Sequence, residues 1–126
     1  MRNWFQGLVA AIVLVGCTAS SVVDQAKLLG GEPFSKEAWA SANQEQRGRM
    51  VASFLSQHAP ETLSAESVKQ WLGPPTGYYD YDENVAYFVG PQSVRSQYGK
   101  GYLLVFIADK TSGKITSVKI IPEPRR

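Results

Sequence analysis

The chain has 126 residues, of which 44% are hydrophobic and 19% charged, and its net charge is only +2. This length allows one domain, and the composition is that of a globular rather than a disordered chain. The 13 basic residues are offset by 11 acidic ones, without the clustered basic face of a nucleic-acid binder. A single cysteine and a single histidine exclude an intrachain disulfide and a structural zinc site of four such ligands.

The first sixteen residues have the pattern of an export signal. Arg2 precedes an apolar run from Leu8 to Val15, and no acidic residue occurs before Asp24. The run is about half the ~20 residues that a membrane-spanning helix needs. A short apolar core behind a positive start is typical of a cleaved signal peptide. An uncleaved membrane anchor fits this length badly.

The end of the apolar run carries a more specific pattern. Leu14-Val15-Gly16-Cys17 resembles the bacterial lipobox, in which small residues precede an obligatory cysteine. The resemblance implies a diacylglycerol on the sulfur of Cys17, cleavage just before this residue, and a further acyl chain on its new amino group. Two or more chains hold a protein stably on a membrane, whereas one does not. The alternative is an ordinary secretory signal in which Cys17 has no role.

Thr18 bears on the destination of the mature chain. By the sorting rule of lipoproteins in cells with two membranes, an aspartate after the acylated cysteine retains the protein in the inner membrane. Thr18 stands there instead. The resemblance therefore implies an exported protein in the inner leaflet of the outer membrane, facing the periplasm.

The mature chain is predicted to begin with a tether and to continue as one domain. Residues 17–34 contain paired serines, paired glycines and a proline without a sustained period, which favours a lipidated cysteine followed by a flexible tether. Residues 35–126 are predicted to form a single small domain.

Two helices are predicted at the start of this domain. The first lies within 42–57, where Ser41 and Gln44 match a capping box and an apolar stripe follows. The second covers 65–72, with Ser64 as N-cap, Leu63 and Val68 as a hydrophobic staple, and Trp71 as a candidate core residue. Gly73 is expected to have a left-handed conformation after the helix, and two prolines prevent its continuation.

Strands are predicted in the remaining part. An apolar strand at 85–89 is followed by a polar loop at 92–101 and by a strand at 102–108 that is apolar on both faces. A turn at 109–113 leads to the last strand at 114–121. The predicted fold class is α+β, with two N-terminal helices packed on a three-stranded antiparallel meander sheet.

Four short motifs in this domain carry a family resemblance. They are Arg47-x-x-Met50, the segment Glu66–Pro75 around Leu72-Gly73, the run Tyr87–Gly90, and Gly113-Lys114-Ile115. Over Trp39–Pro122 they resemble the small outer-membrane lipoproteins of the SmpA/OmlA type, the superfamily that includes the BamE subunit of the β-barrel assembly machinery. The resemblance implies a BamE-like fold, which also occurs in tandem in β-lactamase inhibitor proteins.

The sequence offers no convincing catalytic or metal site. His58 is the only histidine, and the chain shows no pattern that would make it a catalytic base beside a nucleophile. Asp80-x-Asp82-x-Asn84 begins like a calcium loop, but Val85 stands where that loop requires glycine. The chain is therefore predicted to be no enzyme and to need no metal, no nucleic acid and no cofactor beyond the acyl chains.

Tyrosines form the one feature that suggests a binding surface. Several of them cluster around the first predicted strand among charged residues, and tyrosine is favoured at protein interfaces. Tyr79, Tyr81 and Arg95 are the candidate partner surface, and the favoured alternative is that the tyrosines fill the open sheet face and edges of a small domain. We expect a membrane-anchored, non-enzymatic interaction or accessory module, with a role in envelope assembly. The alternative is an inhibitor or immunity-like protein that binds one soluble enzyme, and an envelope enzyme is the least favoured interpretation.

The lipobox interpretation predicts the fate of two variants. Cys17→Ala should abolish palmitate labelling and leave a precursor that still carries residues 1–16, because acylation precedes cleavage. Thr18→Asp should move the protein toward the inner membrane on a density gradient. A wild-type chain that carries no lipid and begins at Ala19 or beyond would contradict the interpretation.

Overall fold

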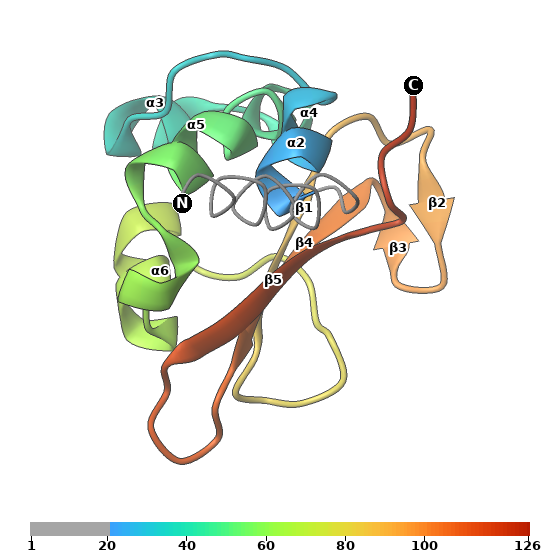
Figure 1. The fold of residues 1–126 in the computed structure, drawn as a ribbon. Coiled ribbons are helices and arrows are strands. Elements are labelled where there is room, and N and C mark those ends of the chain that lie inside the picture. Colours follow the sequence, from blue (N-terminus) through green and yellow to red (C-terminus); the bar gives the residue numbers. More distant parts are fainter. Residues whose placement is uncertain (1–20) are drawn as a thin grey trace, which may run out of the picture.

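The computed structural model describes residues 21–126, so Cys17 and Thr18 lie outside the described residues. Helices occupy the N-terminal half and a three-stranded antiparallel sheet the C-terminal half, with the helices packed on the sheet (Figure 1). The predicted α+β class is confirmed. The helices are α2 (Val22–Lys27), α3 (Lys36–Ser41), α4 (Gln44–Gly48), α5 (Val51–Gln57), the 3₁₀ turn η1 (Pro60–Thr62) and α6 (Ala65–Leu72).

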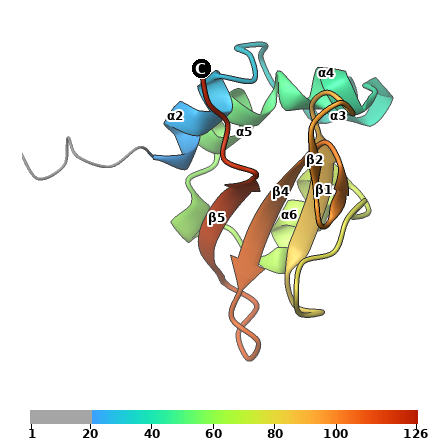
Figure 2. The same cartoon turned by 90° about the vertical axis from the view of Figure 1, so that its right-hand side faces the viewer.

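The sheet has the predicted meander order. Strands β1 (Val85–Val89), β4 (Tyr102–Ala108) and β5 (Ile115–Ile121) pair antiparallel in the order β1-β4-β5, so β4 is central. The segment predicted as a polar loop contains a small hairpin of β2 (Arg95–Ser96) and β3 (Gly99–Lys100). Figure 2 shows α6 behind the sheet and the other helices along its upper end.

Both faces of the central strand are covered. Leu104 and Phe106 point into the main core beneath the helices, whereas Leu103 and Val105 belong to a second cluster on the other face. The rings of Tyr79 and Tyr98, from loop segments, and of Phe88, from β1, are partly buried against that second cluster. This double cover is the reason that β4 is apolar throughout, as its sequence indicated.

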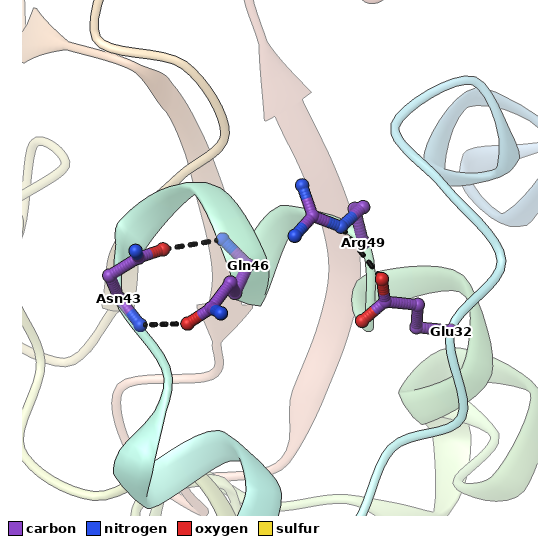
Figure 3. Close-up of polar contacts among 4 residues, drawn as sticks. All are labelled: Glu32, Asn43, Gln46 and Arg49. Atoms are coloured by element: carbon purple, nitrogen blue, oxygen red, sulfur yellow. Dashed lines mark hydrogen bonds and ion pairs between the residues drawn. The ribbon is translucent and has the colours of Figure 1, made fainter.

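The first predicted helix is interrupted, and its predicted N-cap is wrong. Ser41 ends α3, and Asn43 caps α4 through a reciprocal capping box with Gln46 (Figure 3). The carbonyl of Arg49 accepts a hydrogen bond from the N–H of Glu32 at 2.9 Å, between the end of α4 and the start of α5. A continuous helix would use that carbonyl for the residue four positions later, so the crossing chain replaces a helical bond.

The segment 21–34 is part of the folded domain, so the prediction of a flexible tether is wrong there. Ser21 caps α2 by accepting from the N–H of Asp24 at 3.1 Å, and Ala26 and Phe34 are buried in the main core. Figure 2 shows α2 beside α5. The apolar stripe of α2 spans fewer than two turns, which is too short for its period to be recognised against the glycines that follow.

Helix α6 agrees with its prediction in both bounds and N-cap. Ser64 accepts from the N–H of Ser67 at 3.1 Å, and the staple residues Leu63 and Val68 are buried. Gly73 has the expected positive φ of 81°, but its ψ of −167° lies outside the left-handed helical well. Backbone of that kind is accessible almost only to glycine.

Two buried aromatic donors hold the end of α6. Trp39 Nε1–H donates to the carbonyl of Leu72 at 2.9 Å, and Tyr87 O–H donates to the carbonyl of Gly73 at 2.7 Å. The two rings meet edge to face, with centroids 6.1 Å apart. Burial raises the pKa of Tyr87 well above the ordinary value of a tyrosine, opposed by the nearby charge of Arg47.

The core tryptophan is therefore not the predicted one. Trp39 is 1% exposed, whereas Trp71, expected as a core residue, is 37% exposed. Val68 and Leu72 provide the buried face of α6, and Trp71 lies at the boundary of that stripe. Trp71 follows Val68 by three residues, and this spacing did not decide whether its side chain would face the core or solvent.

A matched pair of glycines tests the backbone at the end of α6. A Cβ at Gly73 or at Gly31 would meet no atom within 4 Å, but only Gly73 has a positive φ. Gly73→Ala should therefore lower the free energy of unfolding by about 1–3 kcal/mol through strain alone. Gly31→Ala should leave it unchanged or raise it by about 0.4–1 kcal/mol. Equal effects in urea denaturation would contradict the assigned conformation.

Candidate functional site

The tyrosine loop, residues 78–84, is fastened at both ends to the sheet. Just before it, the N–H of Gly77 donates to the carbonyl of Ala86 at 3.1 Å. At its far end, Asn84 donates through Nδ2 to the carbonyl of Tyr79 at 2.9 Å and accepts from the N–H of Ala108 at 3.0 Å. A single asparagine side chain therefore joins the loop to the end of the central strand.

The tip of the loop is a tight turn. Asp80 has a φ of 59°, the one positive value outside glycine among residues 21–126. The N–H of Tyr81 donates to the carbonyl of Tyr79 at 2.6 Å, and the N–H of Asn84 donates to the carbonyl of Tyr81 at 3.1 Å. Aspartate tolerates this backbone region better than most residues, and such conformations concentrate at functional sites.

Two tyrosines project from this turn into solvent. Tyr81 is 65% exposed and Tyr78 is 58% exposed. The Tyr78 hydroxyl donates to the carboxylate of Asp82 at 3.0 Å, and this hydrogen bond raises the pKa of Tyr78 above its ordinary value. Asp80, Asp82 and Glu83 make the surface around the rings acidic.

Tyr79 lies on the sheet side of the loop. Its ring is half-buried against Tyr98, with centroids 5.4 Å apart, and the ammonium of Lys119 lies 5.7 Å from its centroid. Tyr79 therefore helps to close the second core cluster. This matches the alternative in which tyrosines fill the open sheet face.

The predicted set of Tyr79, Tyr81 and Arg95 does not form one cluster of contacts. Arg95 is exposed on β2, and no hydrogen bond, ion pair or cation–π contact within residues 21–126 joins it to either tyrosine. Tyr81 is the member of the set that presents a free aromatic ring. The sequence analysis did not select Tyr78 as a candidate. Its proximity to three acidic residues in the sequence was the signal that could have indicated it.

The chemistry available at this loop is that of binding. Exposed phenol rings offer apolar area and a hydroxyl at low entropic cost, and the neighbouring carboxylates can accept hydrogen bonds from a partner. Within residues 21–126 no three histidine, cysteine, aspartate or glutamate side chains gather as metal ligands would. The amide of Asn84 is occupied by the backbone bonds described above.

A second aromatic group lies at the exposed face of α6. The tilted rings of Trp71 and His58 are in contact, with centroids 4.4 Å apart, and His58 in turn packs on Phe54 at 4.8 Å. His58 thus packs between the rings of Phe54 and Trp71. His58 follows the end of α5 and Trp71 lies on α6, so no local pattern could indicate their contact.

Comparison with known proteins gives no identification. No family model matches the chain, and no curated protein and no solved structure matches it. None of the helices in residues 21–126 has the length and apolar character required to span a membrane.

Proposed function

We propose that the chain is a lipoprotein anchored through Cys17 that acts as a protein-binding module on the periplasmic side of the outer membrane. The lipobox at Leu14-Val15-Gly16-Cys17 and the residue Thr18 support the anchor and its location. The arrangement of helices on a three-stranded meander supports the resemblance to SmpA/OmlA-type lipoproteins. That resemblance favours an accessory role in envelope assembly.

The observation that carries protein binding is the exposure of two aromatic rings on a fastened loop. Tyr78 and Tyr81 are each more than half exposed, while hydrogen bonds from Asn84 hold the backbone beneath them. A binding loop that is already ordered loses less conformational entropy when it meets a partner. Tyrosine is also among the residues that contribute most to binding at interfaces.

Site-specific crosslinking in cells of the native host tests this proposal. A photoreactive phenylalanine analogue at position 81 should give a defined crosslinked product, because that ring projects from the loop. The matched control is the same analogue at Glu45, an exposed residue of α4, which lies away from the tyrosine loop in Figure 1. Mass spectrometry of the product would distinguish an assembly component from a single soluble enzyme.

The contribution of Tyr81 to binding affinity is tested with the variant Tyr81→Ala. Once the crosslinked partner is purified, the variant should bind it more weakly by about 2 kcal/mol or more, roughly thirtyfold. Its melting temperature should stay within a few degrees of wild type, because the ring contributes little to the core. Unchanged affinity, or crosslinks as strong from position 45 as from position 81, would contradict the tyrosine loop as the docking site.

A further inference from the structure

A small pocket between α3 and α6 has an unusual lining. It has a volume of about 240 Å³, and its lining includes Trp39 and Trp71 together with Lys36, Arg47 and Gln70. Both charged residues in this lining are cations, and no carboxylate belongs to it. The pocket lies on different elements from the tyrosine loop.

Arg47 is held in place at this pocket without a charge partner. Its Nε donates to the carbonyl of Trp39 at 2.9 Å, and its guanidinium carbon lies 4.9 Å from the centroid of the Trp39 ring. Within residues 21–126 no aspartate or glutamate forms an ion pair with Arg47 or with Lys36. Burial lowers the pKa of Arg47, which reflects partial desolvation of a charge that stays on the side chain.

Unlike Arg47, Arg49 has a charge partner within the fold. Its Nε meets the carboxylate of Glu32 at 2.8 Å in an ion pair (Figure 3). Arg49 therefore has its anion within the fold, and it fastens the segment before α3 to the break between α4 and α5. A partly desolvated guanidinium such as that of Arg47 is stabilised by an anion that forms hydrogen bonds to its outer nitrogens.

We propose that the pocket between α3 and α6 binds an acidic residue of a protein partner, with the carboxylate on Arg47 and Lys36 and a neighbouring apolar side chain against Trp71. A guanidinium fixed by stacking presents its outer N–H groups in the geometry that a carboxylate accepts. The volume is below the roughly 300–1,000 Å³ usual for small-molecule sites, which suits one or two side chains of a peptide. The exposed indole favours a peptide over a bare inorganic anion, because it offers apolar area beside the cations.

This proposal rests on the proposed function in requiring a protein partner, but it uses other residues. Its test uses defined peptides rather than the unknown partner. A tyrosine loop that fails its crosslinking test would therefore leave the peptide result standing, and the reverse also holds.

The experiment follows the indole N–H signals of the full acylated chain in neutral detergent micelles by NMR. Acetyl-Phe-Glu-amide should shift the Trp39 and Trp71 signals saturably. Acetyl-Phe-Gln-amide, which has nearly the same shape without the charge, should bind at least about tenfold more weakly, because charge-assisted hydrogen bonds to arginine are lost.

Variants of the pocket residues test whether the glutamyl peptide binds in this pocket. Arg47→Gln should weaken binding of the glutamyl peptide about tenfold, and Lys36→Gln about threefold because an exposed cation contributes less. Lys36 is exposed on the first turn of α3, so its variant keeps the test valid even if Arg47→Gln unfolds the chain. Lys110→Gln, at an exposed lysine in the β4–β5 turn, is the matched control and should bind as wild type does.

Three results would overturn the proposal. The glutamyl and glutaminyl peptides could bind equally, or Lys36→Gln could bind as tightly as the wild type. Vesicles containing phosphatidylserine could shift the two indole signals while neither peptide does, which would assign the cations to a lipid headgroup.

Discussion

The C-terminal end of α6 is where the two halves of the molecule are joined. The carbonyls of Leu72, the last residue of the helix, and of Gly73, its C-cap, cannot accept bonds within the helix. Trp39 from α3 and Tyr87 from β1 each donate one hydrogen bond to them. Buried carbonyls without such donors would be costly, so two large aromatic side chains are fixed in position by the need to satisfy two backbone oxygens.

Both proposed binding surfaces depend on this junction. The bond from Tyr87 to Gly73 joins residues fourteen apart and closes the base of the segment that carries the tyrosine loop. The bond from Trp39 to Leu72 joins α3 to α6, which form the walls of the pocket around Arg47. A protein of this size thus presents a loop and a pocket on a shared support, and neither needs a separate domain.

The sequence predicted those features that local physics determines. Helix α6 was recognisable because Ser64, Gly73 and the prolines mark its ends, and the central strand because it is apolar on both faces. The interruption near Arg49 was not predictable, since it depends on Glu32, a residue seventeen positions away. Likewise α2 has a stripe too short to recognise, and its burial depends on packing against α5 and β5.

The candidate site was predicted only in part, for a related reason. A count of tyrosines indicated an aromatic surface, but which rings face solvent is decided by the turn at Asp80 and by the contact of Tyr79 with Tyr98. The pocket between α3 and α6 could not be predicted from the sequence, because Trp39, Arg47 and Trp71 come from separate elements. Sequence spacing within one helix cannot indicate such a meeting.

A double-mutant cycle on Trp39 and Tyr87 tests the junction at the end of α6 most directly. Tyr87→Phe removes only a hydroxyl and should lower the free energy of unfolding by about 1–3 kcal/mol, because the carbonyl of Gly73 loses its buried donor. Trp39→Phe should cost at least as much, and the two losses should be coupled by about 0.5 kcal/mol or more. Trp71→Phe, at a partly exposed indole, is the control. The account is contradicted if Tyr87→Phe and Trp39→Phe unfold in urea at the wild-type midpoint, or if their costs add without coupling.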